Sequence, residues 1–303
     1  MDATDMSGDL SVEMEVDAFR RLFPLRYHEH HHLIESIRPD ARAFGKARDT
    51  TITLGAVASA NGSALVKIGC TTMLAAVKLE VMTPSVQLPN EGSLAVDFFM
   101  PPICSPLVRP GRPAKEAPVI AKQLSDTILS SGLINLTELS LVSGKAAWMV
   151  YLDIYCLDAD GALFDAALLS AVAAFSHLQI PVVSLNDDGR IVVVSEENGG
   201  KIEQEAVNKD KRKLKLNNIA FSLTCILHKN YILADPTAEE ESIMETLVTV
   251  VLNSSGQLVS LYKPGGSVLA FTSAVQGCIK LATERVKELR QVLDDAISDM
   301  DVE

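Results

Sequence analysis

The segment DADGALFDAALLSA, residues 158–171, joins two expected elements in a geometry that commonly binds phosphate. An apolar run at 149–157 predicts a strand before it, and apolar residues at helical spacing predict a helix after it. A turn at Asp160-Gly161 would then direct the free N–H groups of the helix toward an anion, which the helix dipole also favours. The next three side chains, however, cannot hold a phosphate: Ala162, Leu163 and Phe164.

A second set of residues that could bind an anion lies in a proline-rich loop at 101–113. Arg109 and Arg112 stand in this loop, and its prolines limit its freedom, so both guanidinium groups could face a nucleic-acid phosphate at small entropic cost. The same arginines could instead pair with local acids such as Glu116, and both interpretations remain open. The loop leads into a helical pattern at 114–132, and the glycine at its end is predicted to cap the helix.

Histidines cluster in the segment YHEHHH, residues 27–32, which raises the question of a metal site. They are contiguous and no cysteine is near, whereas useful ligands on a helix recur at i and i+4. Only His28 and His32 have that spacing. The pattern therefore favours a solvated helix face, and no metal site is predicted.

The composition of the 303-residue chain is typical of a globular protein, with 48% hydrophobic and 22% charged residues. The net charge of −12 argues against a free-standing nucleic-acid binder, although a subunit could offer a few arginines to a shared channel. Five scattered cysteines without a CxxC pair indicate neither a disulfide framework nor a zinc site, and suit a reducing compartment. No secretory signal and no apolar run of the roughly 18 residues that span a membrane are found. A cytoplasmic or nuclear protein is expected.

Hydrophobic periodicity predicts an α+β fold with two similar halves, each built from strands followed by helices packed on the sheet. Alternating runs between 50 and 82 flank Asn61-Gly62, a strong signal for a type I′ hairpin. The other expected elements are a short helix at 11–24, strands at 93–99, 147–157, 190–195, 215–227 and 230–234, helices at 114–132 and 238–244, a hairpin at 247–262, and a long helix at 268–297. We expect three parts: an acidic extension with a short helix (1–35), a first half (36–180), and a second half with the long helix (181–303).

Four segments resemble those of the RNase PH family and occur in the family's order: IRPDARAF (37–44), GSALVKIGCTTMLAAVKLEV (62–81), DADGALFDAALLSA (158–171) and LADPTAEEES (233–242). The resemblance runs from about residue 36 to 290, and its first and last segments are most similar to non-catalytic RNase PH-type ring subunits of the eukaryotic RNA exosome. One departure is Ala41, where the family motif usually has glycine. The resemblance implies an RNase PH-like fold in both halves.

Active members of this family cleave RNA from its 3′ end by phosphorolysis, and their turn usually has an acid followed by Gly-Gly-Thr-Arg, which holds the attacking phosphate. Matched to that motif, Asp160 and Gly161 are kept, and the remaining positions are replaced by Ala162, Leu163 and Phe164. Phenylalanine in place of arginine removes a planar bidentate phosphate ligand and its positive charge. Asp165 would then add a negative charge at the helix N-terminus and repel phosphate.

Two further positions depart from the active pattern. In active relatives the helix matching 114–132 carries several arginines, and the matching residues here are Lys122, Asp126 and Leu129. Active members also pair two aspartates near the last segment, where Asp235 is kept but Thr237 stands at the partner position. Asp235 is therefore predicted to cap the following helix, with Pro236 at its first position, rather than to serve a reaction.

The resemblance implies a non-catalytic structural and RNA-path subunit of the exosome ring, supporting 3′–5′ RNA processing and degradation, including rRNA maturation and mRNA turnover. No catalytic residue, metal or cofactor is expected, and the expected RNA-binding residues are Arg109, Arg112 and Lys122. The expected partners are other RNase PH-type subunits in a hetero-oligomeric ring, RNA-binding cap subunits, an associated nuclease and single-stranded RNA. The expected location is the nucleus, including the nucleolus, and the cytoplasm.

Two other functions are considered. The chain could be an active phosphorolytic 3′–5′ exoribonuclease with an altered phosphate site, which Leu163-Phe164 argues against. It could also be an unrelated phosphate-utilising α+β enzyme, but the sequence contains no nucleophile or cofactor motif that supports this function.

Overall fold

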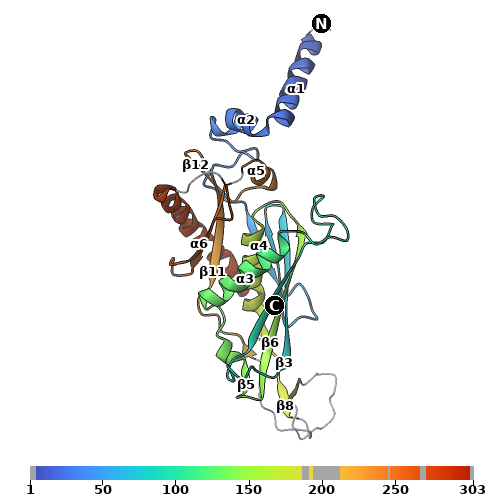
Figure 1. Cartoon of the computed structure of the whole chain (residues 1–303), viewed down its shortest axis with the longest axis vertical. Helices are drawn as coiled ribbons and strands as arrows, with labels where there is room; N and C mark the ends of the chain where they lie inside the picture. The colour runs from blue at the N-terminus through green and yellow to red at the C-terminus, as the bar shows by residue number, and fades with distance from the viewer. Residues whose placement is uncertain (1–4, 186–190, 194–211, 245, 267–270, 301–303) are drawn as a thin grey trace.

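The two halves of the chain form separate sheets, with helices between and beside them (Figure 1). The computed structural model describes residues 5–185, 191–193, 212–244, 246–266 and 271–300. None of the helices in these ranges is both long and apolar enough to cross a membrane.

Alternating burial marks the strands of the first sheet. Along β6, Val150, Leu152 and Ile154 are fully buried, and the residues between them face the other side of the sheet because successive strand residues alternate. The order is β1-β2-β3-β6-β4, with β5 also paired to β6, and only β4 and β6 run parallel. The strands are β1 (Thr50–Leu54), β2 (Gly62–Ile68), β3 (Thr71–Met82), β4 (Ser93–Phe99), β5 (Ser140–Val142) and β6 (Ala146–Asp158).

The second sheet is antiparallel, in the order β12-β11-β13-β14. It consists of β11 (Ala220–His228), β12 (Tyr231–Ala234), β13 (Leu247–Asn253) and β14 (Leu258–Tyr262). Two short pairs lie between the halves in sequence: β7 (Gln179–Ile180) with β10 (Arg212–Lys213), and β8 (Val183–Leu185) with β9 (Ile191–Val193). The predicted α+β architecture with two similar sheets is confirmed.

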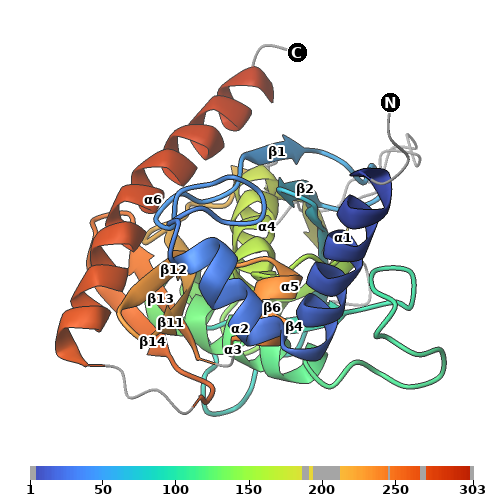
Figure 2. The ribbon, with the colours of Figure 1, turned by 90° about the horizontal axis from the view of Figure 1, so that it is seen from above.

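Helix α4 (Leu163–His177) lies between the two sheets and packs on β2, β3 and β11 (Figure 2). All its residues from Phe164 to Phe175 are buried, as expected for a helix that is apolar on every side. Helix α3 (Ala117–Ser131) packs on β4 and ends at Gly132, whose φ of 65° confirms the predicted glycine cap. The long helix α6 (Thr272–Met300) covers β1, β11 and β13 along one side of the molecule.

The N-terminal segment is more helical than the sequence indicates. The helix expected at 11–24 is α1 (Asp5–Leu22), followed by α2 (Pro24–His28) and a π-helical turn η1 (Glu29–Leu33). His28 is buried and its ring lies 4.7 Å from that of His32, so the expectation of a solvated histidine face is wrong for this residue. The buried ring shows that the end of α2 packs against the protein.

Most other predicted elements are present within one to five residues of their expected ends, including α5 (Ala238–Ile243). The 3₁₀ turn η2 (Leu136–Leu139) was not predicted. The strand expected at 190–195 appears as β9, and its residues 190, 194 and 195 lie outside the described ranges. The same holds for residues 268–270 of the expected last helix. The division of the chain near residue 180 remains a prediction.

The predicted type I′ turn at Asn61-Gly62 is wrong. Strands β1 and β2 do pair, but residues 55–61 connect them and Gly62 is already in β2. The Asn61 side chain instead accepts a hydrogen bond from the N–H of Leu79 at 3.0 Å. Gly62 is needed for packing, because a Cβ there would lie 2.6 Å from the carbonyl oxygen of Ala174 in α4.

Gly62→Ala should therefore destabilise the protein, because the added methyl group meets helix backbone that cannot move aside without shifting α4. We expect a loss of about 1–3 kcal/mol in the free energy of unfolding, measured by urea denaturation. Gly265→Ala is the control, since a Cβ there meets nothing within 4 Å. Equal unfolding midpoints for both variants would contradict the packing explanation.

Candidate functional site

The turn after β6 has the strand–turn–helix geometry expected from the sequence. Strand β6 ends at Asp158 and α4 begins at Leu163, and the two residues before the helix have left-handed backbone, with φ of 73° at Gly161 and 48° at Ala162. A Cβ on Gly161 would lie 2.5 Å from the carbonyl oxygen of Pro236. The turn is thus pressed against the chain that leads into α5.

A carboxyl group from the second half fills this turn. Glu241 of α5 accepts a hydrogen bond from the N–H of Ala162 at 2.8 Å. Free N–H groups at a helix N-terminus are the groups that bind anions in phosphate sites. Asp160 also faces α5, where its Oδ1 accepts a hydrogen bond from the N–H of Ala238 at 3.3 Å. The N–H of Ala162 is therefore already satisfied by an acid of the same chain.

The three residues that follow Gly161, at which the sequence departs from the family motif, are buried or partly buried. Ala162 is 2% exposed, and Leu163 is partly buried against the core. Phe164 is 7% exposed and packs edge-on against Tyr262 of β14, with ring centroids 5.8 Å apart. The side chain at the position of the family's arginine is thus a core contact between the two halves.

Asp165 does not play the part expected from the sequence. Its Oδ2 accepts a hydrogen bond from the N–H of Thr224 on β11 at 2.6 Å, and the residue is buried. It therefore ties α4 to the second sheet. The acid that bonds to the turn is Glu241, which the sequence did not single out.

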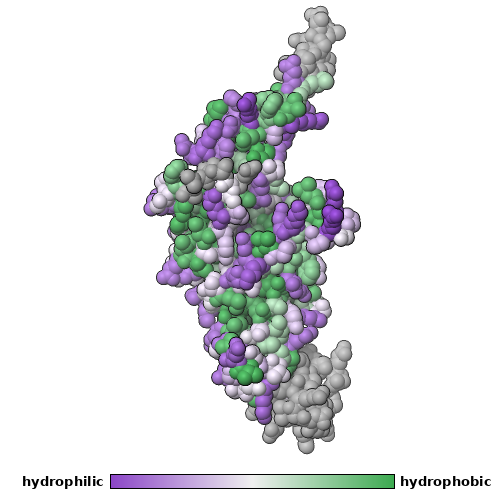
Figure 3. All heavy atoms as spheres, viewed as in Figure 1, coloured by the Kyte–Doolittle hydropathy of each residue, from purple (hydrophilic) through white to green (hydrophobic). Residues whose placement is uncertain are grey.

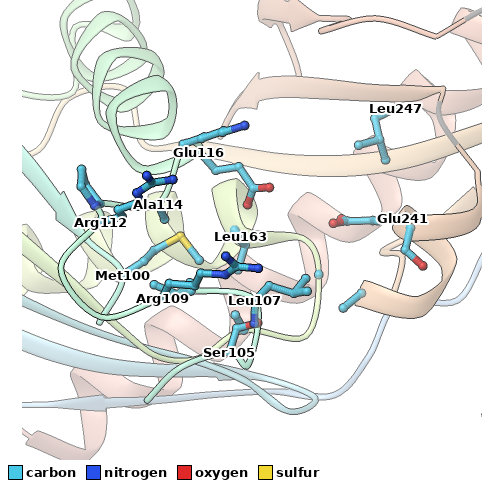
Figure 4. A pocket seen from close by; sticks show the side chains of 17 residues that line it. Met100, Ser105, Leu107, Arg109, Arg112, Ala114, Glu116, Leu163, Glu241 and Leu247 are labelled. Carbon is cyan, nitrogen blue, oxygen red and sulfur yellow. The ribbon is translucent and has the colours of Figure 1, made fainter. Parts of the chain in front are cut away.

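A cavity of about 610 Å³ lies beside the turn, between the loop at 101–113 and α5 (Figure 4). Arg109 and Arg112 line it from the loop, Leu163 from the turn and Glu241 from α5. The structure thus brings the predicted loop arginines together with the altered turn. In Figure 3, the loop at 101–113 projects on the right and carries hydrophilic and hydrophobic side chains next to each other.

The two loop arginines are available to an external anion. Both are exposed, and neither Arg109 nor Arg112 has a side-chain hydrogen bond or an ion pair with any described residue. The alternative in which they pair with Glu116 is therefore not observed. Glu116 does line the same cavity, so the cations share it with acids.

Lys122 does not join this group. It lies on the exposed side of α3, where its Nζ is 2.7 Å from a carboxylate oxygen of Asp126 one turn later. It is absent from the cavity lining. Its assignment to RNA binding remains a prediction.

Asp235 is the centre of a buried charge network that the sequence did not reveal. Arg48 donates to it from its backbone N–H at 2.7 Å, from Nε at 2.9 Å and from Nη2 at 2.7 Å. Arg42 adds a contact of 3.3 Å, and Arg48 Nη1 lies 3.3 Å from Asp160. Although burial opposes the shift, Arg48 holds the pKa of Asp235 below its usual range. The network joins the start of the first half, the turn and the entry to α5.

The prediction that Asp235 caps α5 is wrong. Thr237 is the N-cap, and it forms a capping box with Glu240. Asp235 has a left-handed backbone with φ of 49°, which is uncommon for a residue with a side chain. Its carboxylate is held by Arg48 instead of by the helix.

A second buried ion pair joins the same segments. Arg38 and Glu240 are 2% and 0% exposed and form a two-pronged pair, in which Arg38 Nε donates to Glu240 Oε1 at 2.9 Å. The guanidinium also donates to the carbonyl oxygens of Ala234 and Asp235. A signal was present in the sequence, because the arginine-rich segment 37–48 and the acidic segment 233–242 carry opposite charges.

Burial perturbs both acids near the turn. It raises the pKa of Glu241 to about 7, and repulsion from Asp165 and Glu116 adds to the shift. It raises the pKa of Asp165 to about 6. The carboxyl group of Glu241 keeps an oxygen for the Ala162 N–H in either protonation state, so the turn stays occupied across neutral pH.

This arrangement can bind a polyanion at the cavity rim and offers little to bind a phosphate for chemistry. The loop cations are unpaired, whereas the turn contains neither hydroxyl nor guanidinium and already bonds a carboxyl oxygen. No group of three or more metal-binding side chains occurs among the described residues.

The family is shown by sequence comparison. Two domain models match: the 3′ exoribonuclease family, domain 1, over residues 46–181, and domain 2 of the same family over residues 218–285. The first match contains the turn and the loop, and the second contains Asp235 and α5. The chain belongs to the 3′ exoribonuclease, or RNase PH, family, and the predicted RNase PH-like fold is confirmed.

The similar proteins within this family are components of exosome complexes. The exosome complex component Rrp42 of Methanopyrus kandleri is 33% identical over 285 residues, covering 92% of this chain and 98% of the relative. The exosome complex component rrp43 of Schizosaccharomyces pombe is 30% identical over 280 residues, with the same coverage. A chain of the Archaeoglobus fulgidus exosome with RNA bound to the active site has a TM-score of 0.74 and 26% identity, over 92% of this chain and 98% of that chain.

Asp165→Asn should change how stability depends on pH. The carboxyl group has a pKa of about 6 in the folded state against 3.8 for an unperturbed one, so the folded state binds more protons between these values. Its contribution to the free energy of unfolding therefore falls as pH rises through this window. As pH rises from 4 to 7, the free energy of unfolding of the variant should increase relative to that of the unaltered protein by on the order of 2–3 kcal/mol, measured by urea unfolding.

The asparagine side chain has an oxygen that can accept the hydrogen bond from the Thr224 N–H. The variant therefore removes the charge and keeps a partner for this donor. The control is Asp126→Asn, at an exposed carboxylate of α3. A stability difference for Asp165→Asn that stays constant from pH 4 to 7 would contradict the prediction.

Proposed function

We propose that this chain is a non-catalytic structural and RNA-path subunit of an RNA exosome ring. Its relatives are exosome components, and the similar Archaeoglobus structure contains RNA. The hydrogen bond from the Ala162 N–H to Glu241 carries the non-catalytic part of the proposal. An incoming phosphate would have to displace this carboxyl group, and the turn offers no side chain to compensate.

The site also disfavours the alternative of an active phosphorolytic exoribonuclease. Asp235, the retained acid, is 3% exposed and is engaged by Arg48 and Arg42. A charged acid held in this way is a poor candidate for proton transfer to substrate, since its pKa is held low. Its role in the proposal is to join the two halves.

The proposed RNA path runs along the loop that carries Arg109 and Arg112, with Lys122 as a more distant cation. Exposed, unpaired arginines on a proline-rich loop suit phosphate contacts that do not depend on sequence. The proposed partners are other RNase PH-type subunits, RNA-binding cap subunits, an associated nuclease and single-stranded RNA. The proposed location is the nucleus, including the nucleolus, and the cytoplasm, where rRNA maturation and mRNA turnover would engage the complex.

Ring membership predicts obligate assembly. Expressed alone, the chain should be poorly soluble or self-associated, because unpaired strand edges and exposed apolar side chains promote aggregation. Co-expressed with RNase PH-type subunits from the same cell, it should enter a hetero-oligomer whose stoichiometry native mass spectrometry can report. A stable, monodisperse monomer that ignores these subunits would contradict the proposal.

Catalytic silence is the second expected outcome. The isolated chain, given single-stranded RNA, inorganic phosphate and Mg²⁺, should release no nucleoside diphosphates, while an active RNase PH enzyme on the same RNA serves as the control. The double variant Leu163→Thr/Phe164→Arg should not restore activity, because Phe164 is buried against Tyr262 and Glu241 still holds the turn. Phosphate-dependent trimming by the purified chain would overturn this part of the proposal.

The RNA path can be tested in the assembled complex. Changing both Arg109 and Arg112 to Glu should leave assembly intact and weaken RNA binding by the complex. The slope of the logarithm of affinity against the logarithm of salt concentration should shrink by about one to two units, as expected for two lost phosphate contacts. Arg290→Glu on the exposed side of α6 is the control. An unchanged affinity and slope in the double variant would show that the loop faces elsewhere.

A further inference from the structure

One face of the first sheet is left open by the described part of the chain. Helices α3 and α4 pack on the buried side of the sheet, which holds Val150, Leu152 and Ile154 (Figure 1). The alternate residues of β6 face the other way, and all of them from Met149 to Leu157 are exposed or half-buried. These outward residues are Met149, Tyr151, Asp153, Tyr155 and Leu157.

The open face carries exposed aromatic and aliphatic side chains, although an exposed sheet face is ordinarily polar. Phe99 of β4 and Tyr155 of β6 are register partners whose rings stack at 4.9 Å between centroids, and each residue is 42% exposed. Leu157 is equally exposed, and Leu74 of β3 is paired with Tyr155 from the other side. We call this surface, made by Leu74, Phe99, Tyr151, Tyr155 and Leu157, the aromatic face.

Two acids lie within the aromatic face. Asp97 of β4 is the direct register partner of Asp153 of β6, and both point to the open side. Burial raises the pKa of Asp153, and repulsion from Asp97 adds to the shift. Neither carboxylate has a hydrogen bond or an ion pair with a described residue, and Lys78, paired with Tyr151, makes none with them. Like charges directly opposite each other on a sheet are destabilising.

We propose that the aromatic face is a protein-docking surface, and that its occupant is a neighbouring subunit that inserts an arginine or a lysine between Asp97 and Asp153. A cation there would relieve the repulsion between the acids, and the flanking rings would pack on the cation's aliphatic stem and on apolar side chains around it. Buried aromatic anchors around a desolvated charge pair are typical of the energetic centre of a protein interface. The inference rests on the proposed ring membership. It specifies the face of this chain that contacts a neighbouring subunit and the cationic side chain that the neighbour inserts.

A second copy of this chain is a poorer occupant. In a two-fold pairing each copy would present the same patch, so two pairs of carboxylates would meet. Like charges brought together across an interface suppress association. The complementary charge must therefore come from a different chain.

The test uses the full chain co-assembled with RNase PH-type subunits from its own cell. The double variant Asp97→Lys/Asp153→Lys should lose at least tenfold in affinity for the hetero-oligomer, and Asp295→Lys, at an exposed acid of α6, should not. The variant's folding is checked by its circular dichroism and melting temperature. Full assembly of the double variant beside the unaltered chain would overturn the inference while leaving the ring proposal standing. Failure of the unaltered chain to assemble would overturn both.

A second measurement needs no variant. Carbodiimide labelling of carboxyl groups, read by mass spectrometry, should modify Asp97 and Asp153 in the isolated chain and spare them in the complex, while Asp295 is modified in both. Equal labelling of the two acids in free and assembled protein would overturn the inference. Protection in the isolated chain that grows with its own concentration would identify a second copy as the occupant, and would overturn it as well.

Discussion

The pairing of Arg48 with Asp235 is the interaction on which the site depends. Three donors of Arg48 hold one carboxylate that comes from 187 residues away, and the same guanidinium reaches Asp160 in the turn. Removing one partner of such a buried pair typically costs about 3–5 kcal/mol, because the other charge is left without compensation. The position of α5, and with it the carboxyl group of Glu241, follows from this pair and from the parallel pair of Arg38 with Glu240.

The two sheets are held together by apolar packing, and the ion pairs fix how they meet. Helix α4 fills the space between the sheets with small and aliphatic side chains and is buried from Phe164 to Phe175. Apolar packing of this kind is strong but is compatible with small shifts of one sheet relative to the other. Charge-assisted hydrogen bonds require specific distances and angles between donor and acceptor. The hydrogen bond from the Thr224 N–H to Asp165 fixes the helix to the second sheet in the same way.

The sequence predicted what depends on near neighbours. Helix α4 and the cap at Gly132 follow from periodicity and from the freedom of glycine, and both are observed. The turn at Asn61-Gly62 was predicted wrongly because Gly62 is required by close packing against helix α4, which lies more than a hundred residues away in the chain. The role of Asp235 was predicted wrongly for the same reason: its partner, Arg48, is remote in sequence. The exposure of Arg109 and Arg112 follows from the local composition of their loop and is observed, whereas their contact with RNA stays a prediction.

The packing of Phe164 ties the sequence of the turn to the contact between the two halves. An arginine there would place a charged group beside Tyr262 at a position only 7% exposed, and burying a charge without a partner is very unfavourable. A single substitution toward a phosphate ligand would therefore first weaken the contact between the two halves. The contact between the two halves thus restricts which side chains this position of the turn can hold.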